Sequence, residues 1–268
     1  MIVSEHGTPP YLFRRGTSAL VVSMPHAGTY VAPSIGRTLA DVAAQRPDTD
    51  WHLAQLHDFI QSLDATVLVA MHSRYAIDLN RPPDDANLYP GQDTTGLVPV
   101  DTFDRRKLYR AGNPGPAEVQ RRVERYWQPY HRRLAREIER VKSEHGRVVL
   151  WDAHSIRSVV PRFFEGRLAD LNLGNADGRA CDPGLAEAVL GAARRHREFT
   201  SVLNGRFKGG YITRHYGKPS AGVHALQLEM SEATYMDEEP PFAFRDDLAA
   251  RVRPVLHEMM ETALSWAK

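Results

Sequence analysis

The sequence has little cysteine and no long hydrophobic run. Cys181 is the single cysteine among 268 residues, which excludes a disulfide framework and a zinc site built from several cysteines of one chain. No apolar run approaches the roughly 18 residues of a membrane span. Repeats and low-complexity segments are absent as well. We therefore expect one globular domain over residues 1–268.

An excess of one charge is also missing. The formal net charge is +1, which gives no support for the basic face that nucleic-acid-binding proteins use. Arginines are dense between Arg121 and Arg140, but glutamates such as Glu137 lie among them, so we interpret this stretch as a solvated helix face. The first six residues show no basic stretch followed by an apolar core. We expect a cytoplasmic protein that binds neither nucleic acid nor membrane.

Short apolar runs alternate with amphipathic stretches along the chain. The runs are rich in β-branched residues and end in polar residues, which favours buried strands, and the stretches between them have helical spacing. The expected strands are 19–24, 65–70, 148–151 and 223–228, and the expected helices are 53–60, 116–144, 183–195 and 244–267. Residues 82–115 and 170–183 read as long loops. This order predicts an α/β three-layer sandwich with a mixed, largely parallel sheet and helices on both faces.

Two histidines follow buried strands of this sheet. His26 comes after the strand at 19–24 and His154 after the strand at 148–151, both among small residues that let a metal and a substrate approach. Sites in open α/β sheets form beyond the carboxyl ends of the strands. Imidazole is a favoured zinc ligand, and catalytic zinc usually takes three protein ligands and a water. The two histidines therefore suggest a shared metal site, which needs a carboxylate to complete it.

Three aspartates are candidates for that carboxylate. Asp48 and Asp50 both precede the helix expected at 53–60, and either can cap it. We take Asp50 as the ligand and Asp48 as structural. Asp152, two residues before His154, can instead orient a ligand histidine from behind.

Charged residues suited to catalysis and anion binding follow other strands. Glu229 ends the strand at 223–228, where it can serve as general base and then general acid, or form a salt bridge. Arg74, Asn80 and Arg81 follow the strand at 65–70 and suit an anionic substrate, because arginine grips a carboxylate through two hydrogen bonds. The alternative is a surface loop in which Asp78 pairs with an arginine.

A further arginine lies near the carboxyl-terminal third of the chain. Arg214 follows a strand-like run at 209–213 behind glycines. It is a candidate second carboxylate clamp, with an exposed arginine on an edge strand as the alternative.

Taken in order, these residues resemble the zinc carboxypeptidase superfamily and, more closely, the N-formylglutamate deformylases of bacterial histidine degradation. The resemblance runs from about Met24 to Met236. Its most specific segments are MPHAG (24–28), DTDW (48–51), DLNRP (78–82) and NGRFKGGYITRHYG (204–217). The wider superfamily has a glutamate three residues after the first zinc histidine, where this chain has Thr29, so the third ligand must come from elsewhere.

The resemblance implies a zinc carboxypeptidase-like fold and hydrolysis of N-formyl-L-glutamate to formate and L-glutamate. It implies one zinc ion on His26, Asp50 and His154, with Glu229 as the acid–base group and Arg74 stabilising the oxyanion. Asn80, Arg81 and Arg214 would hold the two substrate carboxylates.

Other interpretations remain open at this point. Other divalent transition metals fit the same ligand types. The alternative functions are another hydrolase of N-acyl acidic amino acids, a carboxypeptidase on the same fold, and a binding protein for acidic ligands that has lost its metal. No sequence feature sets an oligomeric state.

Overall fold

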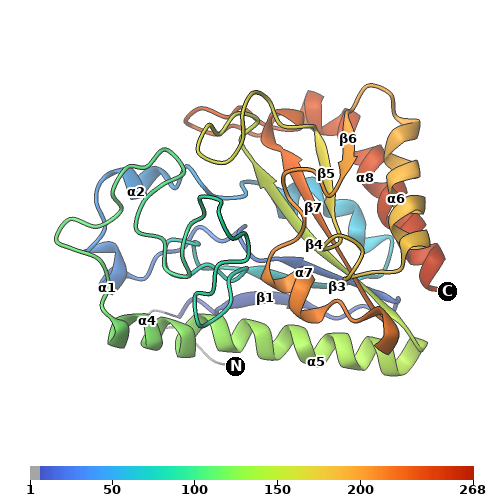
Figure 1. Cartoon of the computed structure of the whole chain (residues 1–268), viewed down its shortest axis with the longest axis horizontal. Coiled ribbons are helices and arrows are strands. Elements are labelled where there is room, and N and C mark those ends of the chain that lie inside the picture. Colours follow the sequence, from blue (N-terminus) through green and yellow to red (C-terminus); the bar gives the residue numbers. More distant parts are fainter. Residues whose placement is uncertain (1–6) are drawn as a thin grey trace.

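A mixed, largely parallel sheet forms the centre of the molecule (Figure 1). The structure is a computed structural model that describes residues 7–268. The first six residues, which entered the expectation of a cytoplasmic protein, lie outside the described residues. The seven strands have the order β1-β3-β2-β4-β7-β5-β6, and only β1–β3 and β5–β7 are antiparallel within the described residues. The strands are β1 Tyr11–Arg14, β2 Leu20–Met24, β3 Thr66–Ala70, β4 Val148–Ile156, β5 Leu171–Gly174, β6 Ser201–Leu203 and β7 Val223–Ser231.

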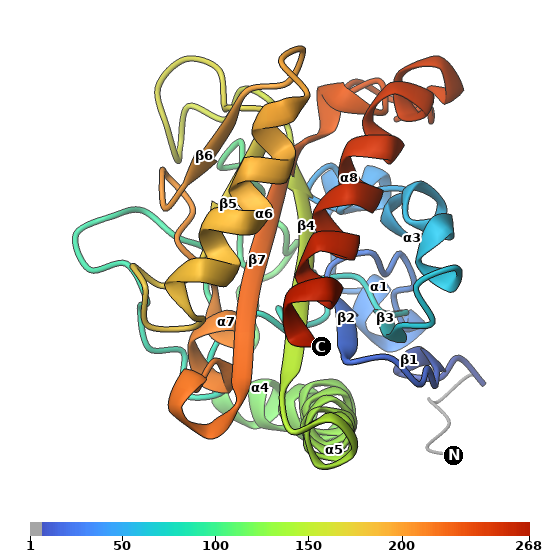
Figure 2. The ribbon, with the colours of Figure 1, turned by 90° about the vertical axis from the view of Figure 1, so that its right-hand side faces the viewer.

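Helices cover both faces of this sheet, because alternate residues of each buried strand point to opposite sides. Leu20 and Trp151 belong to a core shared with α3, α6 and α8, whereas Val21 and Leu150 belong to a core shared with α5 and α7. Figure 2 shows α5 on one side of the sheet and α6 and α8 on the other. The helices are α1 Pro33–Gly36, α2 Val42–Gln45, α3 Leu53–Leu56, α4 Pro116–Arg122, α5 Gln128–His145, α6 Pro183–Arg195, α7 Tyr211–Tyr216 and α8 Asp246–Ala267. The predicted sandwich and sheet type are confirmed.

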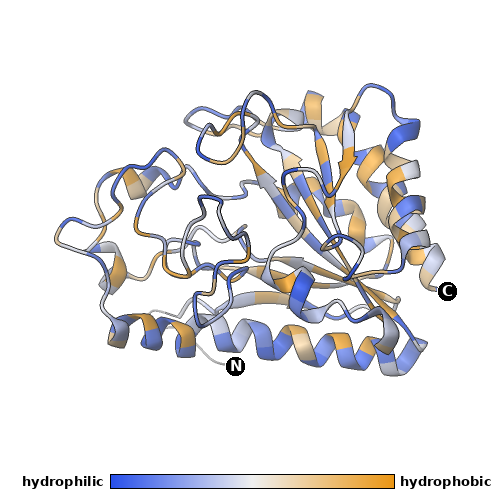
Figure 3. Cartoon of the chain, viewed as in Figure 1, coloured by the Kyte–Doolittle hydropathy of each residue, from blue (hydrophilic) through white to orange (hydrophobic). Residues whose placement is uncertain are grey.

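The long helices follow the amphipathic pattern of the sequence. Polar and apolar residues alternate along α5 and α6 in Figure 3. The helix expected at 116–144 is α4 and α5 joined by a π-helical turn at Val123–Trp127, and the one expected at 53–60 is α3 followed by a 3₁₀ turn at Asp58–Gln61. No helix in the described part of the chain is long and apolar enough to cross a bilayer.

Two expectations about local structure are wrong. Part of the loop expected at 170–183 is strand β5, which is short and carries an asparagine and a glycine, and which forms because it pairs with β6 and β7. The strand-like run at 209–213 instead enters helix α7. The backbone oxygen of Asn80 accepts a hydrogen bond from Tyr211 N at 3.1 Å, and its Oδ1 accepts one from Ile212 N at 2.8 Å. A distant residue thus satisfies the first N–H groups of this helix.

Strands β4 and β7 run further than the apolar patterns predict. They pair in parallel from Val148 to Ile156, and this register sets His154 opposite Glu229. Strand β2 lies on the other side of β4, with Ser23 opposite Asp152. The carboxyl ends of three adjacent parallel strands therefore bring His26, His154 and Glu229 to one edge of the sheet.

Candidate active site and metal centre

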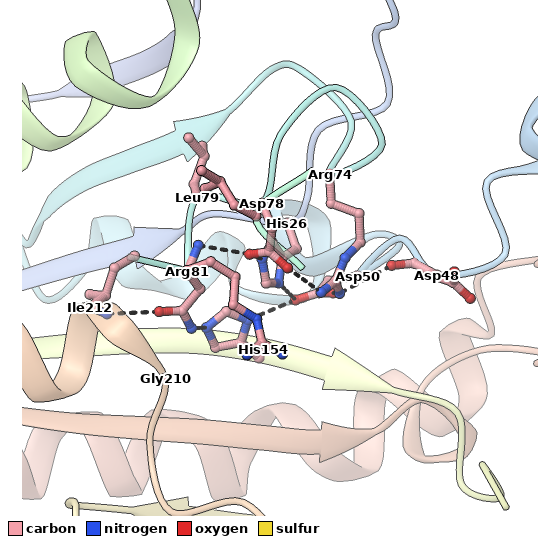
Figure 4. A network of polar contacts seen from close by, with 12 residues as sticks. His26, Asp48, Asp50, Arg74, Asp78, Leu79, Arg81, His154, Gly210 and Ile212 are labelled. Carbon is pink, nitrogen blue, oxygen red and sulfur yellow. Dashed lines mark hydrogen bonds and ion pairs between the residues drawn. The ribbon is translucent and has the colours of Figure 1, made fainter. Parts of the chain in front are cut away.

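His26, Asp50 and His154 meet at this edge, as Figure 4 shows. The two imidazole centroids are 4.8 Å apart. Asp50 Oδ2 lies 3.1 Å from His154 Nδ1 and 3.7 Å from His26 Nδ1. All three residues are buried, and one ligand atom from each lies within 4.8 Å of the others. Two imidazole nitrogens and a carboxylate oxygen at this spacing are a donor set suited to one divalent metal ion.

The far nitrogen of each imidazole is bound to a second aspartate. His26 Nε2 lies 2.7 Å from Asp78 Oδ1, and His154 Nε2 lies 3.2 Å from Asp152 Oδ2. At His26 the Asp78 carboxylate holds the proton on Nε2 and leaves the lone pair on Nδ1, which faces Asp50. At His154 the Asn80 Nδ2 group also lies 2.8 Å from Nε2, so Asp152 and Asn80 together fix the position of this ring. Both imidazoles are therefore held with Nδ1 facing Asp50.

The electrostatics of the site also fit a cation. Burial and Arg74 lower the pKa of His26. Burial alone would lower the pKa of His154, but Asp152 and Asp50 outweigh it and raise that pKa well above its ordinary value. Carboxylates outnumber Arg74 directly around the two imidazoles, and a divalent ion would offset this excess of buried negative charge.

Asp48, the alternative ligand, is turned away from the histidines. Its Oδ2 accepts hydrogen bonds from the Tyr75 hydroxyl at 2.7 Å and from Phe103 N at 3.0 Å. Its backbone oxygen accepts one from Arg74 at 3.4 Å. These contacts give Asp48 a role in fixing the loop that carries Asp50.

Arg74 lies among the metal-site carboxylates. Its Nη2 is 2.6 Å from Asp78 Oδ2, and its Nη1 is 3.9 Å from Asp50 Oδ1. The Asp78 carboxylate thus connects Arg74 to His26 through its two oxygens. Because Arg74 also lines the pocket, its guanidinium is fixed where it can donate to a bound substrate.

A small pocket opens over these residues. Its cavity of about 100 Å³ is lined by His26, His154 and Glu229, together with Arg74, Asn80, Arg81, Arg206 and Gln227 and several aromatic residues. Glu229 is 9% exposed. Burial raises the pKa of Glu229 from its ordinary 4.5 to about 8. A carboxyl group with a pKa near neutrality inside a pocket is typical of an acid–base catalyst.

This pKa predicts how the stability of the metal-free protein depends on pH. Unfolding lets Glu229 ionise near pH 4.5, whereas in the folded protein it ionises only near pH 8, so its ionisation destabilises the fold increasingly across that window. Glu229→Gln should therefore raise the melting temperature of chelator-treated protein at pH 8 more than at pH 5. The exposed Glu239→Gln variant is the control in calorimetry. A gain that is equal at both pH values would contradict the assignment.

The expected substrate clamp is only partly in the pocket. Arg81 lines it. Asn80 also reaches it, but its Nδ2 lies 2.8 Å from His154 Nε2 and 3.3 Å from Asp152 Oδ2, while its Oδ1 caps α7. Arg214 is not among the lining residues, and its Nε donates to Gly209 O at 2.7 Å.

Sequence reasoning missed three residues of this site. Asp78 was interpreted only as an arginine partner, whereas it also binds His26. Gln227 lies on the same face of β7 as Glu229, two residues away, and this spacing could have indicated it. Arg206 lies in the segment 204–217, one of those on which the family resemblance rests. From the sequence, Arg214 of this segment is instead expected to be the second carboxylate clamp.

Comparison with known proteins finds relatives that cover nearly the whole chain. Residues 18–236 match the N-formylglutamate amidohydrolase (FGase) family. An N-formylglutamate deformylase from Pseudomonas aeruginosa is 51% identical over 260 residues, 96% of either chain, and one from Pseudomonas putida is 47% identical over 255 residues, 95% of either chain. The solved N-formylglutamate amidohydrolase of Ralstonia eutropha JMP134 has a TM-score of 0.80 and 26% identity, covering 96% of this chain and 97% of that one. The similarity extends over nearly the whole chain.

Proposed function

Because the chain belongs to the N-formylglutamate amidohydrolase family, we propose that it hydrolyses N-formyl-L-glutamate to formate and L-glutamate with a bound zinc ion. The observation that carries this proposal is the convergence of His26, Asp50 and His154 at the pocket that Glu229 also lines. The ion would be held by the first three residues and would supply polarisation of the formyl carbonyl and a lowered water pKa.

Glu229 moves the protons in this proposal. It takes a proton from the attacking water and passes it to the nitrogen that leaves as the amine of glutamate. It must be ionised to accept that proton, although burial raises its pKa to about 8. Positive charge beside a carboxylate favours its ionised form. Glu229 would therefore ionise more readily with a zinc ion bound, when the water is activated.

Arg74 stabilises the negative charge that develops on the formyl oxygen. The guanidinium is held by Asp78 at 2.6 Å and by burial, so it needs no rearrangement when the oxyanion forms. Arg81 receives one substrate carboxylate, and Asn80 holds His154 and Asp152 in place beside it.

We also propose that the reaction ends a bacterial histidine degradation pathway in the cytoplasm. Cells that lack the protein should then accumulate N-formylglutamate when grown on histidine.

The aspartates behind the histidines should tune metal binding. Asp78→Asn removes the charged acceptor at His26 Nε2, so we expect zinc affinity to fall by about 10–100-fold. Competition with a coloured chelator measures this, with Asp48→Asn as a nearby buried control. Equal affinities in the two variants would contradict the orienting role of Asp78.

Formate release from N-formyl-L-glutamate, before and after chelation, tests the proposed function. We expect turnover that the chelator abolishes and added zinc restores. Faster turnover of N-acetyl- or N-succinylglutamate, or of a peptide with a carboxyl-terminal glutamate, would instead indicate another acyl hydrolase or a carboxypeptidase. Absence of both bound zinc and activation by metal would indicate a binding protein.

A further inference from the structure

The pocket holds guanidinium groups of two kinds. Arg74 is paired with Asp78 and Asp50. Arg81 and Arg206 also line the pocket, and neither forms an ion pair with any residue between 7 and 268. Burial lowers the pKa of both guanidinium groups, as desolvation of an uncompensated cation should. Two half-buried cations without carboxylate partners suit a ligand that brings two carboxylates.

Arg206 is held in a fixed position in this pocket. Its Nε donates to the backbone oxygen of Phe163. Its guanidinium carbon lies 5.2 Å from the ring centre of Phe207, 5.7 Å from that of Tyr89 and 6.0 Å from that of Phe163. Aromatic rings at these distances attract the cation and restrict its plane.

This anchoring leaves the outer end of the guanidinium available. Since Nε is used by Phe163, the two Nη groups of Arg206 are the donors left, and neither has a hydrogen-bond partner within the described residues. A pair of Nη groups matches a carboxylate through two parallel hydrogen bonds. The geometry is therefore that of a preorganised carboxylate receptor.

Arg81 and Arg206 reach the pocket from different segments of the chain. Arg81 is close to the residues that hold His26, since its backbone N donates to Asp78 O at 3.3 Å. Arg206 comes from the loop after β6 and lies among aromatic residues. In N-formylglutamate the α-carboxylate is nearer to the scissile amide than the side-chain carboxylate is. Arg81 thus suits the α-carboxylate, and Arg206 suits the one at the end of the side chain.

We propose that Arg206 binds the side-chain carboxylate of the substrate and is the residue that selects glutamate over amino acids with neutral side chains. This inference rests on the proposed function. It gives Arg206 the role that the sequence suggested for Arg214. Arg214 also lies over the Tyr89 ring, at 5.0 Å, but it is not among the pocket-lining residues and its Nε is bound to Gly209 O.

Arg206 and Arg214 lie on one segment of the chain and provide a matched pair of variants for the test. We would measure kcat/KM for N-formyl-L-glutamate and for N-formyl-L-glutamine, which has a neutral side chain of the same shape. Arg206→Met should lower the glutamate value by about 10²-fold or more, because a desolvated carboxylate loses its partner. The glutamine value should change by only a few-fold. Arg206→Lys should retain part of the preference, and Arg214→Met should retain nearly all of it.

Equal losses on both substrates in Arg206→Met would overturn the proposal, because they would show that Arg206 only packs the loops or binds a group common to both. Loss of the preference in Arg214→Met but not in Arg206→Met would overturn it as well. If Arg206→Met does not fold, Arg206→Lys decides: an unchanged preference in that variant contradicts the proposal.

A binding measurement separates this inference from the proposed function. Should the wild type release formate from neither substrate, the proposed function fails, and calorimetry with L-glutamate and L-glutamine still tests the receptor. Tighter binding of L-glutamate that disappears in Arg206→Met supports the proposal. Equal binding of the two amino acids by the wild type contradicts it.

Discussion

Glu229→Gln should lower kcat for formate release by about 10²–10⁴-fold, the usual contribution of a general acid–base group. Glutamine has nearly the same shape but cannot accept the proton of the attacking water. Glu229 lies opposite His154 in the register of β4 and β7 and is not among the residues that could hold a metal ion. The variant should therefore bind as much zinc as the wild type, by elemental analysis, and differ mainly in kcat.

The matched control is Glu232→Gln. Glu232 is also buried, just after β7, and burial raises its pKa well above the ordinary value, yet it is not among the pocket-lining residues. We expect this variant to retain activity within about 10-fold. Near-normal turnover in Glu229→Gln, or equal losses in both variants, would contradict the acid–base role of Glu229.

Asp50→Asn should have the largest effect on metal binding. Asp50 Oδ2 is the oxygen that lies near both Nδ1 atoms, and an amide supplies neither its charge nor its affinity for zinc. We expect zinc affinity to fall by more than the roughly 10–100-fold predicted for the orienting aspartates. Activity without added metal should fall to background, measured on the same dialysed samples.

Asp48→Asn distinguishes the ligand from its neighbour. The carboxylate of Asp48 binds Tyr75 and Phe103, so its loss should reduce thermal stability but leave the zinc content unchanged. If Asp48→Asn loses zinc while Asp50→Asn keeps it, the two aspartates have been assigned in the wrong order.

Sequence alone could predict that His26 and His154 converge, because the argument needs only the topology. Each histidine follows a buried apolar run, and the carboxyl ends of parallel strands share one edge of a sheet. The pairing of β2 with β4 and of β4 with β7 realises this arrangement. The position of Glu229 at the same edge could be predicted from the sequence for the same reason.

The choice between Asp48 and Asp50 could not follow from local sequence. Both lie in the same turn before α3, and either could cap a helix. What separates them is contact with Tyr75 and Phe103, which come from later loops. The resemblance to a family favoured Asp50, but residue spacing did not.

Arg206 and Arg214 show a second limit on what local sequence can predict. The run at 209–213 has strand-like composition, so Arg214 is expected to follow a strand and to serve as a second carboxylate clamp. The run instead starts a helix because Asn80, far away in sequence, accepts its first N–H groups. This turn of the backbone leaves Arg214 outside the pocket, and Arg206 lines it from the preceding loop. Tertiary contacts override local propensity here.

A crystal structure of the zinc-loaded protein, with anomalous data collected at the zinc edge, tests the account most directly. We predict one strong peak about 2.0–2.2 Å from Nδ1 of His26, Nδ1 of His154 and a carboxylate oxygen of Asp50. Zinc bound elsewhere at full occupancy, or no peak between the two imidazoles at saturating zinc, would contradict it.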